Sequence, residues 1–215
     1  SKTVHTQYSC KTKLNNLMRS QKTLTKDSIQ VLSSILDRLF LESPSGDNIS
    51  QFISYLPLMF EMNSNLEFKK LFSESLLSPN AKSSFNRAMV AQNLAVKMNN
   101  SSNYFLSRLL TASYFCDYID SDEPQFHSLQ NATLLESIPA INSEVILAIK
   151  HHHEYNDGSG FLKLKNATIH PLAKYIRFAD EICALQGKSA EVFNERMQFL
   201  QFKIDAPLLR LIKKP

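Results

Sequence analysis

A helical segment of the sequence carries imidazole side chains where its hydrophobic pattern calls for apolar residues. Ile141, Val145 and Ile149 repeat every four residues, as on the buried face of an amphipathic helix. His152 and His153 are the next positions on that face. Because burying an ionisable group without a partner costs several kcal/mol, the pattern predicts that both imidazoles point toward the core and meet partner groups there.

Two carboxylates on other segments also stand where an apolar stripe calls for a hydrophobic residue. Asp180 continues the apolar stripe of Leu172 and Ile176, and Asp117 continues the stripe that starts at Leu106. Two carboxylates and two imidazoles that converge from separate helices make a nitrogen and oxygen donor set suited to iron, manganese or zinc. A single inward Asp or His is more often a hydrogen-bonded core residue, so a purely structural role for each side chain remains an alternative.

The elements that must position these residues are helical nearly throughout. The chain has four glycines among 215 residues and no sustained alternation of Val, Ile and Thr, so we expect an all-α fold. Ser78-Pro79-Asn80 interrupts the pattern and separates an N-terminal helical region (1–78), sensor-like or partner-binding, from a helical domain (79–215). Residues 1–23 are too polar to assign. The expected helices span about 27–40, 84–98, 103–117, 126–137, 143–153, 171–185, 190–202 and 206–212.

Composition excludes several classes of protein. The chain has no run of about 18 uncharged apolar residues and no readable signal peptide, so we expect a cytoplasmic protein without a membrane span. The net charge of +4 comes from 24 basic and 20 acidic residues without a dense basic block, which argues against a nucleic-acid partner. Three widely spaced cysteines argue against a disulfide framework and a zinc finger.

The loop 152–162, His-His-Glu-Tyr-Asn-Asp-Gly-Ser-Gly-Phe-Leu, resembles a motif of the HD-GYP family, bacterial members of the HD superfamily. The family's loop is roughly His-His-Glu, three residues, Gly, one residue, Gly-Tyr-Pro. Residues 169–185 resemble the family's helix that carries a metal-binding Asp, and residues 126–139 resemble its His-Pro helix. The resemblance spans about residues 80–190. It implies a helical bundle around two or three metal ions, usually iron or manganese, and hydrolysis of cyclic di-GMP.

By motif position, the resemblance implies metal-ligand roles for five residues, of which Asp117 and Asp180 would also be catalytic. The pattern of inward polar residues reached four of them independently, whereas His127 rests on the resemblance alone. The implied ligands are Asp117, His127, His152, His153 and Asp180.

Several positions depart from the family motif. Cys116 replaces the histidine of the His-Asp doublet, and Ser84 falls where an earlier ligand histidine is expected. Asp120 replaces a phosphate-binding lysine, which turns attraction for a phosphate into repulsion. The Gly-Tyr-Pro end has become Gly-Phe-Leu at 160–162, and the arginine-bearing stretch after the last ligand is represented by Gln-Gly-Lys-Ser at 186–189.

These departures predict that one metal position survives. It keeps three imidazoles and Asp117, whereas the neighbouring position keeps two carboxylates with Cys116 as a candidate replacement ligand. A thiolate ligand at Cys116 would favour a rebuilt metal site, and a thiol turned into the core would favour the loss of efficient hydrolysis. We expect one iron or manganese ion ahead of zinc, and a metal-free protein is the alternative.

We therefore expect a degenerate HD-GYP-like signalling or binding module with weak or no hydrolysis of cyclic di-GMP. Its partner would be cyclic di-GMP or a signalling protein, and a homodimer is left open. One alternative is an active metal-dependent phosphohydrolase, acting on cyclic di-GMP or on another substrate. The other is a purely structural helical domain.

Overall fold

The computed structural model describes residues 78–119 and 124–212, with separate positions earlier in the chain (30, 33–34, 36–37, 47, 49–56, 70, 72 and 74–75). Within these ranges the chain forms helices and has no strand, apart from one isolated bridge between Asp157 and Lys165. The expected all-α fold is confirmed. The elements are α5 (Pro79–Lys97), α6 (Asn103–Phe115), α7 (Pro124–Glu136), α8 (Ser143–His151), η1 (Asn166–Thr168), α9 (Pro171–Leu185), α10 (Ala190–Leu200) and α11 (Ala206–Arg210).

Side-chain caps decide where several helices begin. The Ser78 hydroxyl accepts a hydrogen bond from the backbone of Ala81, and Pro79 takes the first helical position. Helix α5 therefore starts at Pro79 rather than near Ser84, because the Ser-Pro pair predicted as an interruption is a helix start. Helix α9 begins after His170, as expected from the proline that follows it.

Helix α8 ends earlier than its hydrophobic stripe predicts. The expected segment ran to His153, but the helix stops at His151, and His152 and His153 lie in the turn that follows. A turn at this point matters for the site because it allows two consecutive imidazoles to reach one place.

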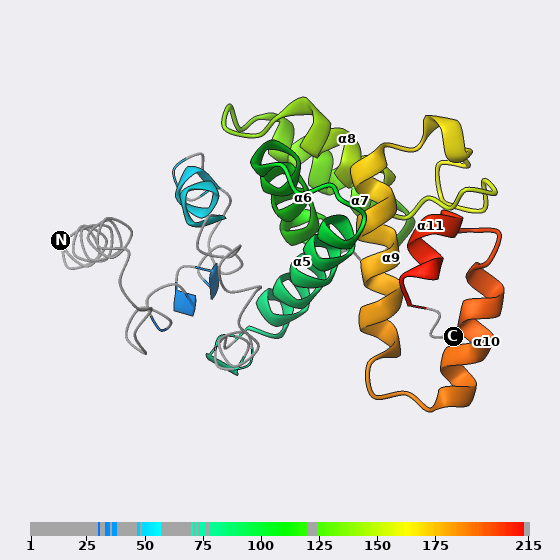
Figure 1. Ribbon diagram of the computed structural model, residues 1–215. Coiled ribbons are helices and arrows are strands. Elements are labelled where there is room, and N and C mark those ends of the chain that lie inside the picture. The colour runs from blue at the N-terminus through cyan, green and yellow to red at the C-terminus, as the bar shows by residue number, and fades with distance from the viewer. Residues whose placement is uncertain are drawn as a thin grey trace.

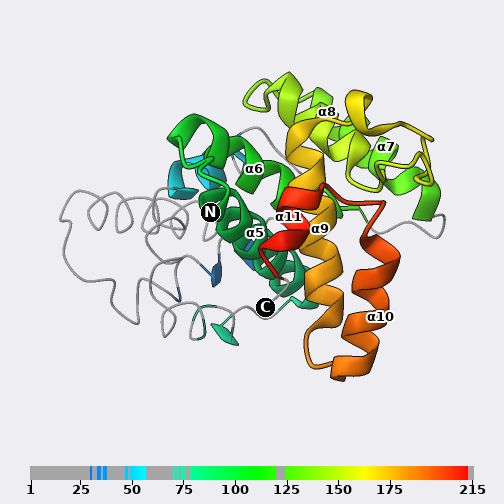
Figure 2. The same ribbon diagram turned by 45° about the vertical axis from the view of Figure 1, so that its right-hand side comes forward.

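Helix α9 runs between α5 on one side and α10 on the other, as Figures 1 and 2 both show. It packs against α5, α6 and α8, and α7 packs against α8. The N-terminal half of α9 lies beside α6 and α8 (Figure 1). The ends of several helices thus meet beside α9.

The described positions before residue 78 pack on α5 and α6. The Phe52 ring lies 4.7 Å from the Tyr114 ring, and the Phe72 ring lies 4.6 Å from the Phe85 ring, measured between centroids. Packing on α5 and α6 is thus a sufficient reason for the apolar residues at 52 and 72. The boundary near residue 78 and the sensor-like or partner-binding role remain predictions, and residues 1–23 lie outside the described part of the chain.

No helix within the described ranges is long and apolar enough to cross a lipid bilayer.

Candidate metal centre

The turns after α6 and α8 and the first half of α7 bring four of the five predicted ligands together. One donor atom from each of Asp117, His127, His152 and His153 lies within 4.8 Å of the others. The Asp117 Oδ1 atom is 3.0 Å from His127 Nε2 and 3.2 Å from His152 Nε2. The His153 Nε2 atom is 2.7 Å from His127 Nε2. We call these four residues the His/Asp cluster.

A buried asparagine, which the sequence analysis did not single out, fixes the turn of Asp117 against α7. The Asn131 side chain accepts a hydrogen bond from the backbone of Ile119 at 2.7 Å and donates one to the carbonyl of His127 at 2.9 Å. Asn131 has no exposed surface. It therefore ties the backbone after Asp117 to the helix that carries His127.

The backbone sets the tautomer of His152. The Nδ1 atom of its ring is 2.6 Å from the carbonyl oxygen of Ile149. A carbonyl oxygen only accepts, so Nδ1 carries a proton and donates it. In the neutral ring the Nε2 lone pair therefore faces the cluster, and this is the arrangement that metal-binding histidines use.

An arginine sets the tautomer of His153 in the opposite sense. Arg177 Nη1 lies 3.2 Å from His153 Nδ1, and a guanidinium only donates. In the neutral ring the proton is therefore on Nε2, which faces His127. Burial, followed by the neighbouring His152, His127 and Arg177, lowers the pKa of His153 to about 2, so the ring is neutral at pH 7.

The neutral cluster contains more acceptors than donors. His152 Nε2 and Asp117 Oδ1 face each other as acceptors, and His127 Nε2 must accept the proton of His153. An additional proton or a metal ion would satisfy these lone pairs. Three imidazole nitrogens and one carboxylate oxygen form a donor set that iron, manganese and zinc accept. The residues of the cluster therefore fit a bound metal ion.

Asp180 lies outside the His/Asp cluster, on the far side of an arginine. Arg87 Nη1 donates to Asp180 Oδ1 at 3.0 Å and also contacts Asp117 Oδ2. Although burial opposes ionisation of Asp117, Arg87 and the two histidine contacts outweigh it and hold the pKa of Asp117 well below its ordinary value. Both carboxylates are thus neighbours of a positive charge.

The sequence analysis missed Arg87, although a signal was present. The residue lies three positions after Ser84 and four before Ala91, both of which are buried on the inner face of α5. Its own side chain is 4% exposed. A cation on an apolar stripe predicts a buried side chain with a charged partner, just as the inward carboxylates do.

The Cys116 thiol lies in the core. Its Sγ atom is 3.5 Å from the carbonyl oxygen of Ser113, and the residue has no exposed surface. Burial raises the pKa of the thiol well above its ordinary value. Cys116 therefore occupies the core as a neutral thiol and is not one of the clustered donors. Asp120 lies outside the described residues.

Glu154 and the two glycines build the loop after His153. The Glu154 carboxylate accepts hydrogen bonds from the backbone of Leu162 and Leu164, each at 2.7 Å. A Cβ atom at Gly160 would lie 2.6 Å from Glu154 Cα, whereas Gly158 has a φ of +82°. The first glycine thus provides a left-handed turn and the second allows close approach.

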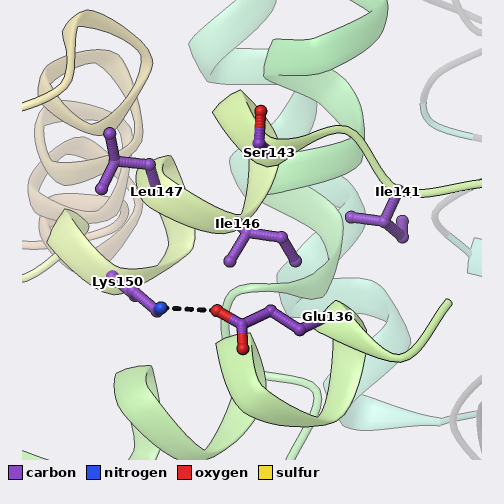
Figure 3. Close-up of a pocket in the computed structure, with 6 residues that line it drawn as sticks. All are labelled: Glu136, Ile141, Ser143, Ile146, Leu147 and Lys150. Atoms are coloured by element: carbon purple, nitrogen blue, oxygen red, sulfur yellow. Dashed lines mark hydrogen bonds and ion pairs between the residues drawn. The ribbon is translucent and has the colours of Figure 1, made fainter. Parts of the chain in front are cut away.

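A pocket of about 420 Å³ opens beside α8. Figure 3 shows that two of the lining residues, Lys150 and Glu136, form an ion pair, with 2.5 Å between Nζ and Oε1. None of its lining residues belongs to the His/Asp cluster. They are Glu136, Ile141, Ser143, Ile146, Leu147 and Lys150.

Comparison with known proteins identifies the fold. No family model and no curated protein matches the sequence. A solved structure that is similar to this chain is Bd1817, a HDG"Y"P protein from Bdellovibrio bacteriovorus, with a TM-score of 0.70 and 15% sequence identity. The match covers 86% of this chain and 69% of that one. Together with the helical architecture, it shows that this chain has the fold of an HD-GYP-like domain.

Proposed function

We propose that this chain is a degenerate HD-GYP-like signalling or binding module that retains one metal site and hydrolyses cyclic di-GMP weakly or not at all. The observation that carries the proposal is the position of Cys116. The residue that stands for the first ligand of the His-Asp doublet is a neutral thiol in the core. In the described part of the chain, the donors that remain together are the four of the His/Asp cluster.

The cluster supports one metal position. A bound iron or manganese ion would lower the pKa of a bound water and polarise a phosphate oxygen. Asp117 stays ionised, which suits ion binding. The neutral ring of His153 would bind an ion through Nε2 after its proton moves from Nε2 to Nδ1, in place of the hydrogen bond from Arg177. In two-metal phosphodiesterases both the attacking and the leaving oxygens are stabilised by metal ions, and one position does not supply both.

The positive groups around the cluster are already paired, which supports weak binding of a phosphate. Arg177 contacts His153 and the carboxylate of Glu181, and Arg196 donates to the same carboxylate at 2.7 Å. A cyclic dinucleotide would have to compete with Glu181 for both guanidinium groups. A signalling protein that reads the bundle surface is the other partner that this proposal admits.

Metal analysis and ligand binding test the proposal on the full chain, purified without a chelator. We expect about one iron or manganese ion per chain by mass spectrometry, and cyclic di-GMP turnover with added manganese far below the ~1–1,000 per second of ordinary enzymes. Ordinary turnover would favour the second candidate, an active phosphohydrolase. The observation that supports this candidate is the cluster of four donors. A chain that binds no metal would contradict the retained site. Calorimetry against cyclic di-GMP separates a nucleotide-binding module from one that binds a protein.

A further inference from the structure

Every nitrogen of the Arg87 guanidinium has a partner inside the bundle. Its Nε donates to the carbonyl oxygen of Ser113 at 2.8 Å, and its Nη2 donates to the Ser84 hydroxyl at 3.3 Å. Its Nη1 bridges Asp117 and Asp180. A cation that is 4% exposed and held between two carboxylates is a built structural feature, because an unpaired buried charge is very costly.

The two oxygens of Asp117 divide the site. Its Oδ1 faces the imidazoles of His127 and His152, and its Oδ2 faces Arg87. We call these the histidine side and the arginine side of Asp117. On the arginine side, Asp180 supplies a second carboxylate to the same cation. Two carboxylates that converge on one point would otherwise attract a divalent cation.

We propose that Arg87 is a built-in cation that takes the place of a second metal ion, so that the centre accepts one metal ion only. This inference rests on the proposed function for the first ion and adds the reason why a second is excluded. The guanidinium is permanently protonated and has no acceptor, so it pairs with both Asp117 and Asp180 and offsets one of their two negative charges, but it provides no open position for water. Asp180 then serves as the partner of Arg87 rather than as a metal ligand.

Arg87 also links helices to one another, as a bound metal ion would. Arg87 lies on α5, its partner Ser113 lies on α6, and Asp180 lies on α9. The arginine side is therefore cross-linked in the absence of any metal. Ser84, where the family resemblance calls for a ligand histidine, is within hydrogen-bond distance of the guanidinium, so restoring a histidine at 84 and removing Arg87 would rebuild the donor set.

The test compares manganese stoichiometry of the full-length variants by mass spectrometry and calorimetry. We expect about one ion per chain for the wild type and for Arg87→Lys, which keeps the charge. We expect about two ions for the double variant Ser84→His with Arg87→Ala, and a melting temperature that rises more with manganese than that of the wild type. Arg108→Ala is the control, because it removes an arginine of α6 that pairs with Glu144 and not with either Asp.

The difference of one ion between the double variant and Arg87→Lys decides the inference. If both bind the same number, or if the wild type binds two, Arg87 does not exclude a metal. If the double variant does not fold even with manganese, the arginine position does not accept an ion, and the inference fails. A wild type without metal contradicts the proposed function instead. In that case the role of Arg87 is still tested by whether the double variant binds one manganese ion more than Arg87→Lys.

Discussion

The histidine side and the arginine side of Asp117 solve one electrostatic problem in different ways. On the histidine side, Oδ1 meets His127 Nε2 at 3.0 Å and His152 Nε2 at 3.2 Å, and rings in their neutral form would provide too few protons for these acceptors. On the arginine side, a permanent cation already satisfies the carboxylates. Under the two proposals above, this bundle keeps one half of a metal centre while Arg87 takes the place of the other half.

The substitution Asp117→Asn should have the largest effect, because the Asp117 carboxylate contacts both the imidazoles of the histidine side and Arg87 on the arginine side. We expect metal affinity to fall by about a hundredfold or more. Because Asp117 is partly exposed and Arg87 keeps Asp180 as a partner, the free energy of unfolding of the metal-free protein should fall by about 2 kcal/mol. Urea unfolding without metal and a metal titration measure the two effects. Asp180→Asn should destabilise the protein and leave metal affinity within about threefold. Equal loss of metal by both variants would break the comparison.

The substitution His152→Gln should affect the histidine side alone. Its ring is held by Ile149 with the lone pair toward the cluster, so we expect a metal affinity about a hundredfold weaker. His151→Gln is a matched control in the same run of histidines, because His151 Nδ1 accepts from the backbone of His170 and lies outside the cluster. It should cost about 1 kcal/mol of stability and leave the metal in place. Metal competition with a chelator distinguishes them.

The sequence was sufficient for the helical fold and for the residues on inward stripes. Asp117, His152 and His153 were found because a polar residue interrupts an apolar repeat, and the fold then brings them together. His127 needed the family resemblance, since its helix has no strong apolar stripe. Arg87 was missed because charged residues are assigned to the surface by default, and only the contact with two carboxylates shows why a buried position suits it.

Local capping explains the remaining errors in the predicted boundaries. Hydrophobic periodicity specifies which face of a helix is buried but not where hydrogen bonding begins and ends. Ser78 and Pro79 extended α5 toward its N-terminus, and a turn ended α8 before His152. Tautomers could not be predicted either, because they depend on groups such as Arg177 that only the fold brings beside His153.

Glu181, the residue after Asp180, provides a second carboxylate and arginine arrangement that can be tested by pH. Although burial opposes ionisation, hydrogen bonds from Arg196 and the charge of Arg177 lower its pKa from 4.5 to about 2. The ionised group therefore stabilises the fold above about pH 4.5, and this contribution is lost as the pH falls toward 2. Allowing for solvent screening, we expect a loss of about 2 kcal/mol over that interval. Thermal unfolding of the wild type and Glu181→Gln should show it, with a flatter profile for the variant.

The last and smallest expected effect concerns Arg177, which contacts His153 in the His/Asp cluster. Arg177 donates to His153 Nδ1, so the proton of the neutral ring occupies the nitrogen that a metal ion would need, and its charge repels a divalent cation. Removing it with Arg177→Met should tighten manganese binding about tenfold, because metal-binding histidines ordinarily have an acceptor at the second nitrogen. Arg196→Met is the matched control, since Arg196 contacts Glu181 and Tyr155 but not His153. If both variants change affinity equally, or if Arg177→Met weakens it, Arg177 supports the ligand position instead of opposing it, and the two sides of Asp117 would then both depend on arginine.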